Sequence, residues 1–294
     1  MSNLFIIGNG FDIAHGLKTS YEDFHIFLRR SYPNAKESDI IPEYVIDHHG
    51  NECCKNEDEV VGFIEYVLSS IEGDKWSDLE SSVGKIEYNN YIPDNDDYDD
   101  DNEYDKMYYT EDFSMNLVKP ILEIPTYFDK WVFSINTNGI ILKKDFFNLI
   151  NKNSDLFLSF NYTHTLEETY GIHNVCHIHG KMGEKLYFGH GVQRDYFADD
   201  NYGLVPGTEE SFQQMHDALK KDTIAAFQHH SDFFANLSTL NKIDEIYSYS
   251  FSFSDVDMFY IQQIFNCINT ENIIWWLNDY DDKTTRNNYM IKIR

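Results

Sequence analysis

Leu4-Phe5-Ile6-Ile7-Gly8-Asn9-Gly10-Phe11-Asp12 opens the chain and decides its fold class. Four apolar residues that end at a glycine are typical of a buried strand in a parallel sheet. A glycine pair after such a strand lets the backbone turn sharply and approach a phosphate, which helix N–H groups then hold. We therefore expect a Rossmann-like nucleotide pocket on this turn. Ile13 replaces the third glycine of the dinucleotide fingerprint, so a tight turn without a ligand stays open as an alternative.

Further short apolar runs recur along the chain and alternate with helical patterns. They span residues 156–160, 175–179, 186–188, 246–249, 273–277 and 290–293. Strands that alternate with helices indicate a mostly parallel sheet covered by helices. The sequence thus predicts one α/β domain over residues 1–294. In it the first strand neighbours those at 156–160 and 175–179, and Gly8, Asn161 and His179 share one edge of the sheet.

The segment from about residue 20 to 150 shows no strand pattern, and we expect a mostly helical insertion there. Within it, residues 94–105 are strongly acidic. Like charges repel and extend a chain, so this run is interpreted as a solvated loop. A calcium loop of the EF-hand type needs glycine at its sixth position and glutamate at its twelfth, where this chain has Asp99 and Asp105. The calcium interpretation is rejected.

Composition restricts the classes of function. The chain has 294 residues, of which 42% are hydrophobic, and a formal net charge of −27. Phosphate contacts need clustered Lys and Arg, so broad nucleic-acid binding is not expected. No apolar run is long enough to span a bilayer as a helix, and no signal-peptide pattern opens the chain. The 4 cysteines form no C-x-x-C pair. We expect a cytoplasmic protein without a membrane partner.

Polar residues follow the second predicted strand in Ser159-Phe160-Asn161-Tyr162-Thr163. An amide at the carboxyl end of a strand can orient a ribose or a water, because α/β sheets bind ligands in the crevice at that edge. The alternative is an ordinary helix N-cap by Asn161 or Thr163.

Two histidines lie in Cys176-His177-Ile178-His179-Gly180. Side chains alternate along a strand, so we expect His177 and His179 to share a face. Zinc usually takes three or four ligands, and no neighbouring residue completes a recognisable set, so no metal site is predicted. A histidine titrates near neutral pH and can act as a general base. We expect His179, with open space beside Gly180, to do so, and His177 to be the more structural of the pair.

Small residues also follow the later runs. Gly189-His190-Gly191 follows one, and Ser250-Phe251-Ser252-Phe253-Ser254-Asp255 follows another. Their hydroxyls and backbone amides either line a nucleotide site or form plain turns and helix caps.

Taken in order, these segments closely resemble the AbiH-type bacteriophage abortive-infection proteins. The resemblance rests on residues 4–21, 76–80, 160–163 with 166–167, 178–180 and 188–191. Ser252-Phe253-Ser254-Asp255 is similar to the family's late Ser-Leu-Ser-x-x-Asp segment. The resemblance runs nearly end to end, with little of it between about 90 and 145. It implies a role in defence against phage that is restrained until a trigger arrives.

The order of motifs also resembles, more distantly, the sirtuin-like fold. That resemblance implies that Gly8 and Gly10 approach the pyrophosphate of NAD, that Asn161 positions the nicotinamide ribose or the attacking water, and that His179 is the catalytic histidine. Two departures stand out: the turn carries Asn9 and Asp12 instead of small Ala and Ser, and the zinc-binding cysteine pairs are absent. The second departure favours NAD cleavage over protein deacylation.

Two functions from different classes follow. The first is an enzyme that hydrolyses NAD at the nicotinamide–ribose bond, with Asn161 and His179 as catalytic residues and no required cofactor. The expected nucleotide contacts are Gly8, Asn9, Gly10, Phe11, Asp12, Thr163, Gly180, Ser252 and Asp255. The second is a non-enzymatic acidic interaction or nucleotide-sensing protein, whose partner is a phage protein or another copy of the chain. The enzyme requires Asn161 and His179 to converge beside the first turn, and the binding protein does not.

Overall fold

A computed structural model describes residues 2–72, 78–93, 103–198, 205–239, 243–278 and 281–293. Trp76, Ser77 and residues 94–102 of the acidic run therefore lie outside the described residues. The chain forms two compact units. The sheet unit comprises Met1–Ser20, Val132–Tyr187 and Lys221–Arg294, and the helical unit comprises Tyr21–Trp131 and Phe188–Lys220.

A parallel sheet forms the centre of the sheet unit. Among the described residues it has 5 strands: β1 (Leu4–Ile7), β4 (Leu156–Ser159), β5 (Val175–His177), β6 (Glu245–Tyr249) and β7 (Ile274–Trp276). Their order is β5-β4-β1-β6-β7, and every neighbouring pair is parallel. The chain starts in the middle, builds one side of the sheet and then the other, which is the Rossmann order. The predicted α/β class and the predicted neighbours β1, β4 and β5 are confirmed.

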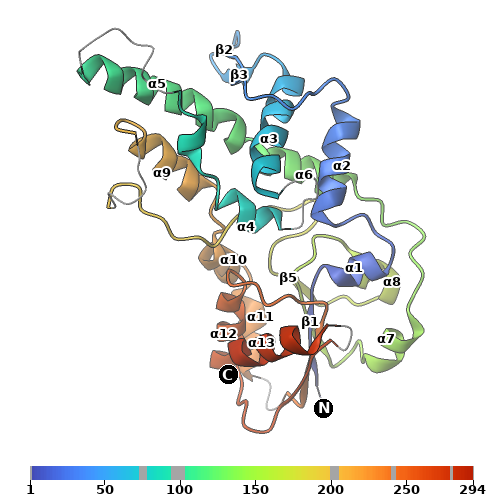
Figure 1. The fold of residues 1–294 in the computed structure, drawn as a ribbon. Helices are drawn as coiled ribbons and strands as arrows, with labels where there is room; N and C mark the ends of the chain where they lie inside the picture. Colours follow the sequence, from blue (N-terminus) through green and yellow to red (C-terminus); the bar gives the residue numbers. More distant parts are fainter. Residues whose placement is uncertain are drawn as a thin grey trace. The chain divides into compact units, whose positions relative to one another are not determined.

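Helices cover both faces of this sheet (Figure 1). One face packs against α10 (Thr223–His229), α11 (Ser231–Thr239), α12 (Met258–Cys267) and α13 (Lys283–Ile293). The other face packs against α1 (Gly10–Ala14), α7 (Lys144–Leu149) and α8 (Thr165–Tyr170). Alternate residues of a strand point to opposite faces. Leu4 and Ile6 therefore enter the first core and Phe5 and Ile7 the second, which explains why β1 is apolar throughout.

An aromatic ladder runs across four strands of the sheet. Phe157, Phe5, Tyr247 and Trp276 are directly paired in register. Their successive ring centroids are 5.2, 4.9 and 6.2 Å apart, and the planes are nearly parallel. Stacked aromatic pairs add roughly 0.5–1.5 kcal/mol each beyond the area they bury. The ladder thus stabilises the register of β4, β1, β6 and β7 together.

The helical unit holds the other described elements. Its helices are α2 (Tyr21–Ser31), α3 (Glu57–Glu72), α4 (Leu79–Val83), the 3-10 turn η1 (Tyr88–Tyr91), α5 (Glu103–Leu122), most of α6 (Ile124–Ser134) and α9 (Glu209–Ala218). The segment expected as an insertion supplies residues 21–131 to this unit, and residues 132–150 belong to the sheet unit.

Three sequence expectations about strands were wrong. The span from 20 to 150 contains an antiparallel hairpin of β2 (Tyr44–Ile46) and β3 (Glu52–Cys54), whose turn is closed by the Asp47 carboxylate. Its strands are too short to show a period of two. The run at 186–188 is not a strand, and the run at 290–293 belongs to helix α13. Short apolar runs do not distinguish strand from helix.

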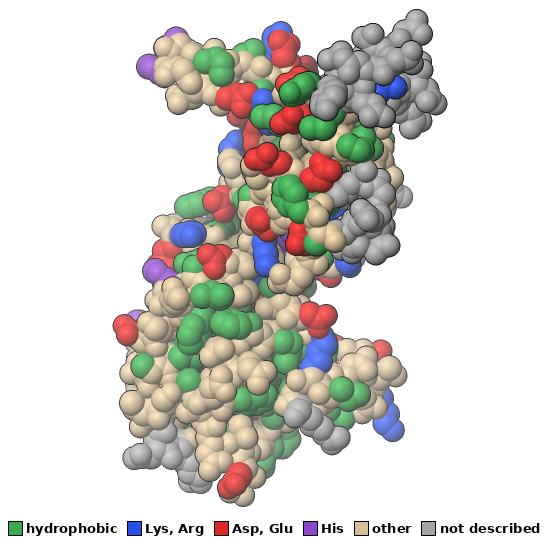
Figure 2. All heavy atoms as spheres, turned by 90° about the vertical axis from the view of Figure 1, so that its left-hand side faces the viewer, with side chains coloured by type: hydrophobic (Ala, Val, Ile, Leu, Met, Phe, Trp, Pro, Cys, Tyr) green, Lys and Arg blue, Asp and Glu red, His purple; other side chains and the backbone are tan. Residues whose placement is uncertain are grey.

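The surface carries the negative charge expected from composition. On the face drawn in Figure 2, acidic side chains are interspersed with apolar and basic ones, and the described residues on that face form no stripe of Lys and Arg. None of the described helices combines the length and the apolar character that a bilayer crossing requires.

The centre of the ladder is expected to carry more stability than its exposed end. Phe5 is fully buried, so Phe5→Ala should lower the free energy of unfolding by about 3–5 kcal/mol, the usual cost of such a truncation. Trp276 is 49% exposed, so Trp276→Ala should cost clearly less. Chemical denaturation of both variants measures the difference. Equal losses of unfolding free energy in the two variants would contradict the burial of β1 on both of its faces.

Candidate functional site

The carboxyl ends of three neighbouring strands form the candidate site. Hydrogen bonds extend the ladder beyond the strands: Phe160 N–H donates to Ile7 O over 2.8 Å, and Ile178 N–H donates to Ser159 O over 3.0 Å. Gly8, Asn161 and His179 follow β1, β4 and β5 and therefore lie at one edge of the sheet, as predicted.

Gly8 is required by the close approach of the segment after β6. A Cβ at this position would collide with the backbone of Ser250 and Phe251. The Gly8 N–H also donates to Tyr249 O over 2.9 Å. Ser250 itself has a left-handed φ of 55°, and its N–H donates to Asn278 Oδ1 over 2.8 Å. The space beside Gly8 is thus filled by protein backbone.

The rest of the first turn starts helix α1. Asn9 is exposed, and its Nδ2 donates to Thr19 O over 2.7 Å, while Gly10 is the first helical residue. Phe11 is fully buried and packs against Phe146 in the core. Of the expected nucleotide contacts in this turn, the Phe11 side chain therefore points into the core. Its backbone is engaged as well, since the N–H donates to Gly8 O over 3.0 Å and the carbonyl accepts from His15 N–H over 3.2 Å.

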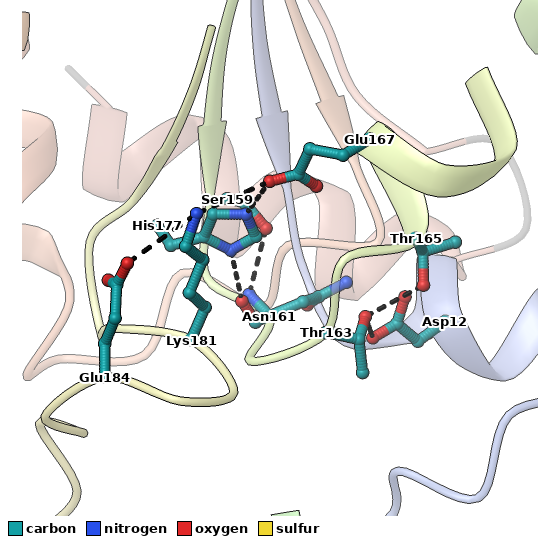
Figure 3. Close-up of polar contacts among 9 residues, drawn as sticks. All are labelled: Asp12, Ser159, Asn161, Thr163, Thr165, Glu167, His177, Lys181 and Glu184. Atoms are coloured by element: carbon teal, nitrogen blue, oxygen red, sulfur yellow. Dashed lines mark hydrogen bonds and ion pairs between the residues drawn. The ribbon is translucent and has the colours of Figure 1, made fainter. Parts of the chain in front are cut away.

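Asp12 is a buried carboxyl that faces the segment after β4 (Figure 3). Its Oδ2 accepts a hydrogen bond from Thr163 Oγ1 over 2.6 Å, and Thr163 Oγ1 lies 2.8 Å from Thr165 Oγ1. Burial raises the pKa of Asp12 to about 6, against the opposing effect of hydrogen bonds from Thr163, Thr165 and Asn161. The carboxyl therefore changes charge close to neutral pH.

Asn161 has a fixed backbone and a buried side chain. Its N–H donates to Ser159 Oγ over 3.2 Å, and its carbonyl accepts from His177 Nδ1 over 2.8 Å. Figure 3 shows the carboxamide extending from the His177 side toward Thr163. The side chain thus lies buried between two polar groups (Figure 3).

His177 is held by acceptors at both ring nitrogens. Nδ1 faces the Asn161 carbonyl, and Nε2 lies 2.9 Å from Glu167 Oε1. Burial raises the pKa of Glu167, but the hydrogen bond and charge of His177 outweigh this and hold it below its ordinary value. His177 thus links the Asn161 backbone to the Glu167 carboxylate. Lys181 Nζ lies 4.0 Å from the same carboxylate.

His179 enters a different polar cluster. Its Nε2 lies 3.0 Å from Asp257 Oδ1, an ion-pair distance, and Lys221 Nζ lies 3.6 Å from the same oxygen. The Asp257 Oδ2 accepts from Ser254 Oγ over 2.7 Å. The expectation that His177 and His179 share a face was wrong, because β5 ends at His177 and the chain turns there: Gly180 N–H donates to His177 O over 2.9 Å.

The sequence analysis missed Asp257, the buried carboxylate that lies beside His179. Asp255, the expected contact, has a side chain 94% exposed and pairs with Lys292 at 2.7 Å, and Ser252 is exposed too. The family segment Ser-Leu-Ser-x-x-Asp places its acid three residues after the second serine. In this chain that position is Asp257, so the spacing alone was enough to find it.

Gly180 serves a tight loop and does not open a space. Its φ is +77°, and a Cβ there would collide with the carbonyl of Lys185. The expectation of free room beside His179 was therefore wrong, because the backbone of the next loop occupies it.

Four buried acceptor oxygens at this edge accept no hydrogen bond from the described residues: Asp12 Oδ1, Asn161 Oδ1, Glu167 Oε2 and Asp257 Oδ1. The last of these lies within ion-pair distance of His179 and Lys221, whereas the first three have no such cation. A buried polar atom without a partner costs about 1–3 kcal/mol and is rare in folded proteins. Hydrogen-bond donors are the groups that such oxygens lack. The described residues contain no group of three or more side chains suited to hold a metal ion.

His190 of the Gly-His-Gly segment belongs to the helical unit. Its Nε2 lies 3.1 Å from the His216 carbonyl, and a Cβ at Gly84 would press on its ring. Burial, helped by His216, lowers the pKa of His190 to about 4. This histidine is therefore neutral and packs as a structural residue.

The Asp12 carboxyl should be visible in the pH dependence of stability. Its pKa rises from 3.8 to about 6 on folding, so between these values the folded state binds more protons than the unfolded chain. Stability is therefore lost as the pH rises through this window, by about 3 kcal/mol in total. Asp12→Asn should remove that loss, and Asp145→Asn, at an exposed acid of α7, should not. Denaturation at pH 4 and pH 7 tests this; parallel curves for wild type and Asp12→Asn would refute it.

The comparison with protein families agrees with the resemblance found in the sequence. The family model for bacteriophage abortive infection AbiH matches residues 4–279. These residues include every strand of the sheet and all the side chains of the candidate site. Neither a curated protein nor a solved structure matches the chain. With most of its length covered by that match, the chain belongs to the bacteriophage abortive infection AbiH family.

Proposed function

We propose that this chain hydrolyses NAD at the nicotinamide–ribose bond and that the edge of β1, β4 and β5 is the active site. The observation that carries the proposal is the set of buried acceptor oxygens, Asp12 Oδ1, Asn161 Oδ1 and Glu167 Oε2, without partners among the described residues. A ribose supplies hydroxyl donors to such acceptors. NAD is the substrate, and no further cofactor is required.

Hydrolysis of the nicotinamide–ribose bond requires acceptor groups of this kind. The bond between C1′ of the ribose and the nicotinamide nitrogen breaks, water forms a new bond to C1′, and the products are nicotinamide, ADP-ribose and a proton. The transition state carries positive charge on the ribose. Oriented acceptors in a site that excludes water stabilise developing positive charge, since they need no reorganisation during the reaction.

Asn161 is assigned the positioning of the ribose or the attacking water. Its backbone is held from both sides by Ser159 and His177, so its carboxamide projects from a fixed point. An amide does not exchange protons near neutral pH, and its contribution is therefore orientation.

His179 is assigned the contact to a ribose hydroxyl and the exchange of a proton. Imidazole is the side chain suited to that exchange near neutral pH. Asp12 adds a carboxyl whose pKa of about 6 lets it carry a negative charge under physiological conditions. That charge favours the cationic transition state.

A second candidate is a nucleotide sensor that binds and does not cleave. One observation favours it: among the contacts of the described residues, none joins the side chains of Asn161 and His179 directly. Asn161 lies with His177, and His179 lies with Asp257. A sensor needs the ribose contacts of the cluster around Asn161 and does not need the cluster around His179.

Asn161→Ala and His179→Ala should each reduce NAD cleavage at least about 100-fold and abolish phage protection, because each removes a group that acts on the reacting atoms. Nicotinamide release from the purified protein and plaque counts measure the two effects. Asn153→Ala and His173→Ala, at exposed positions of the same unit, should change neither. Circular dichroism verifies the fold of each variant.

The outcomes separate the two candidates. A folded His179→Ala protein with full cleavage and full protection would exclude the enzymatic proposal as written. Protection that depends on Asn161, with no nicotinamide released by any variant under activating conditions, would establish the sensor instead.

A further inference from the structure

Asp257 lies at the start of α12 in a turn that fixes its side chain. The N–H groups of Asp257 and Met258 both donate to Ser254 O, over 3.0 and 3.1 Å. The Ser254 hydroxyl then donates to the carboxylate itself over 2.7 Å. The residue is buried, and its second carboxylate oxygen faces His179 and Lys221. The hydrogen bond from Ser254 and the two ion pairs together restrict this carboxylate to one orientation.

We propose that Asp257 is the positioning residue of His179: it holds ring nitrogen Nε2 in place and leaves Nδ1 as the nitrogen that meets the ligand. The catalytic meaning of this pairing rests on the proposed function, whereas the pairing itself is a property of the folded chain.

The ring of His179 is constrained on its other sides by aromatic residues. Phe160 meets it edge to face at 5.1 Å between centroids, and Tyr260 and Tyr162 lie at 5.7 and 6.2 Å. The His179 carbonyl accepts from Tyr187 N–H over 2.8 Å, which fixes the backbone as well. With the ring plane set by its neighbours, the carboxylate of Asp257 decides which nitrogen is turned inward.

Lys221 is a second positively charged partner of Asp257. The Lys221 side chain is fully buried, and its ammonium neutralises Asp257. Burial raises the pKa of Asp257, but the charges of Lys221 and His179 outweigh this and hold it well below its usual range. The carboxylate thus stays charged and remains a fixed ionic partner for the His179 ring.

His177 provides the internal contrast. Both of its nitrogens face acceptors, and Lys181 Nζ lies 4.0 Å from its partner Glu167. Neither nitrogen of His177 is therefore turned away from a protein partner. The two histidines of one strand end therefore have different partners and different tasks: His177 holds the backbone of Asn161, and His179 presents a nitrogen to the ligand.

The activity test uses Asp257→Asn. The proposal expects kcat for nicotinamide release to fall at least about 100-fold with KM within about threefold, because orientation is lost and ground-state binding is kept. The pH profile of kcat should also change its shape, which loss of a purely structural contact would not cause. Asp222→Asn is the matched control: it is an exposed N-cap aspartate beside Lys221, and it should behave as wild type. A folded Asp257→Asn protein with wild-type kcat and pH profile overturns the proposal.

A measurement on the wild-type protein keeps the test independent of folding and of activity. In protein labelled with ¹⁵N-histidine, long-range ¹H–¹⁵N spectra report which imidazole nitrogen carries the proton, and the His179 signals are assigned by their loss in His179→Gln. The proposal expects the proton of neutral His179 on Nε2; a proton on Nδ1 overturns it. If the wild type releases no nicotinamide, the proposed function fails, and this spectrum alone decides the pairing.

Discussion

No side chain fits at the end of β1, because a Cβ at Gly8 would collide with the backbone of Ser250 and Phe251. This contact brings the segment after β6 across the end of the central strand. The same segment continues into the turn that carries Ser254 and Asp257. Helix α1 begins two residues after Gly8 and places Asp12 at the same edge. Both polar clusters of the site therefore depend on the absence of one Cβ.

The two clusters differ in their electrostatics. Asp12 is buried beside hydroxyls and an amide, and its pKa rises to about 6. Asp257 is buried beside an ammonium and an imidazole, and its pKa falls below its usual range. The pKa values of these two buried carboxyls, at one edge of the sheet, are thus shifted in opposite directions. Such pairs are typical of sites that bind or transfer charged groups, because a site that served stability alone would give each carboxyl a positively charged partner. The unpartnered oxygens cost stability in the free chain, which a ligand with donors would recover.

The hydrophobic cores on the two faces keep this edge in place. The aromatic ladder links β4, β1, β6 and β7, so the strands that carry Asn161 and the Ser254–Asp257 turn share one register. Phe160 packs in the core with α12, and Phe11 packs in the core with α7 and α8. Residues adjacent to the polar groups are thus buried apolar anchors, which explains how short connecting turns hold these groups in place.

The sequence by itself determined the α/β class, the central strand, the glycine turn and the common edge of Gly8, Asn161 and His179. These features follow from local patterns: a buried parallel strand is apolar throughout, and strands of one parallel sheet end at the same side. The helical conformation of residues 290–293, at the end of α13, and the hairpin at 44–54 could not be predicted from the sequence. A run of three or four residues is too short to distinguish a strand from a helix.

Only the tertiary structure decided the partners of the polar side chains. It separated His177 from His179, directed Phe11 into the core, and paired Asp257 with His179 and Lys221. Each of these outcomes depends on residues far apart in the chain that meet through packing, such as Lys221 of the segment before α10 and Asp257 of the turn before α12. Local periodicity reports which face a residue occupies, whereas the identity of a buried charge's partner is set by which elements pack together.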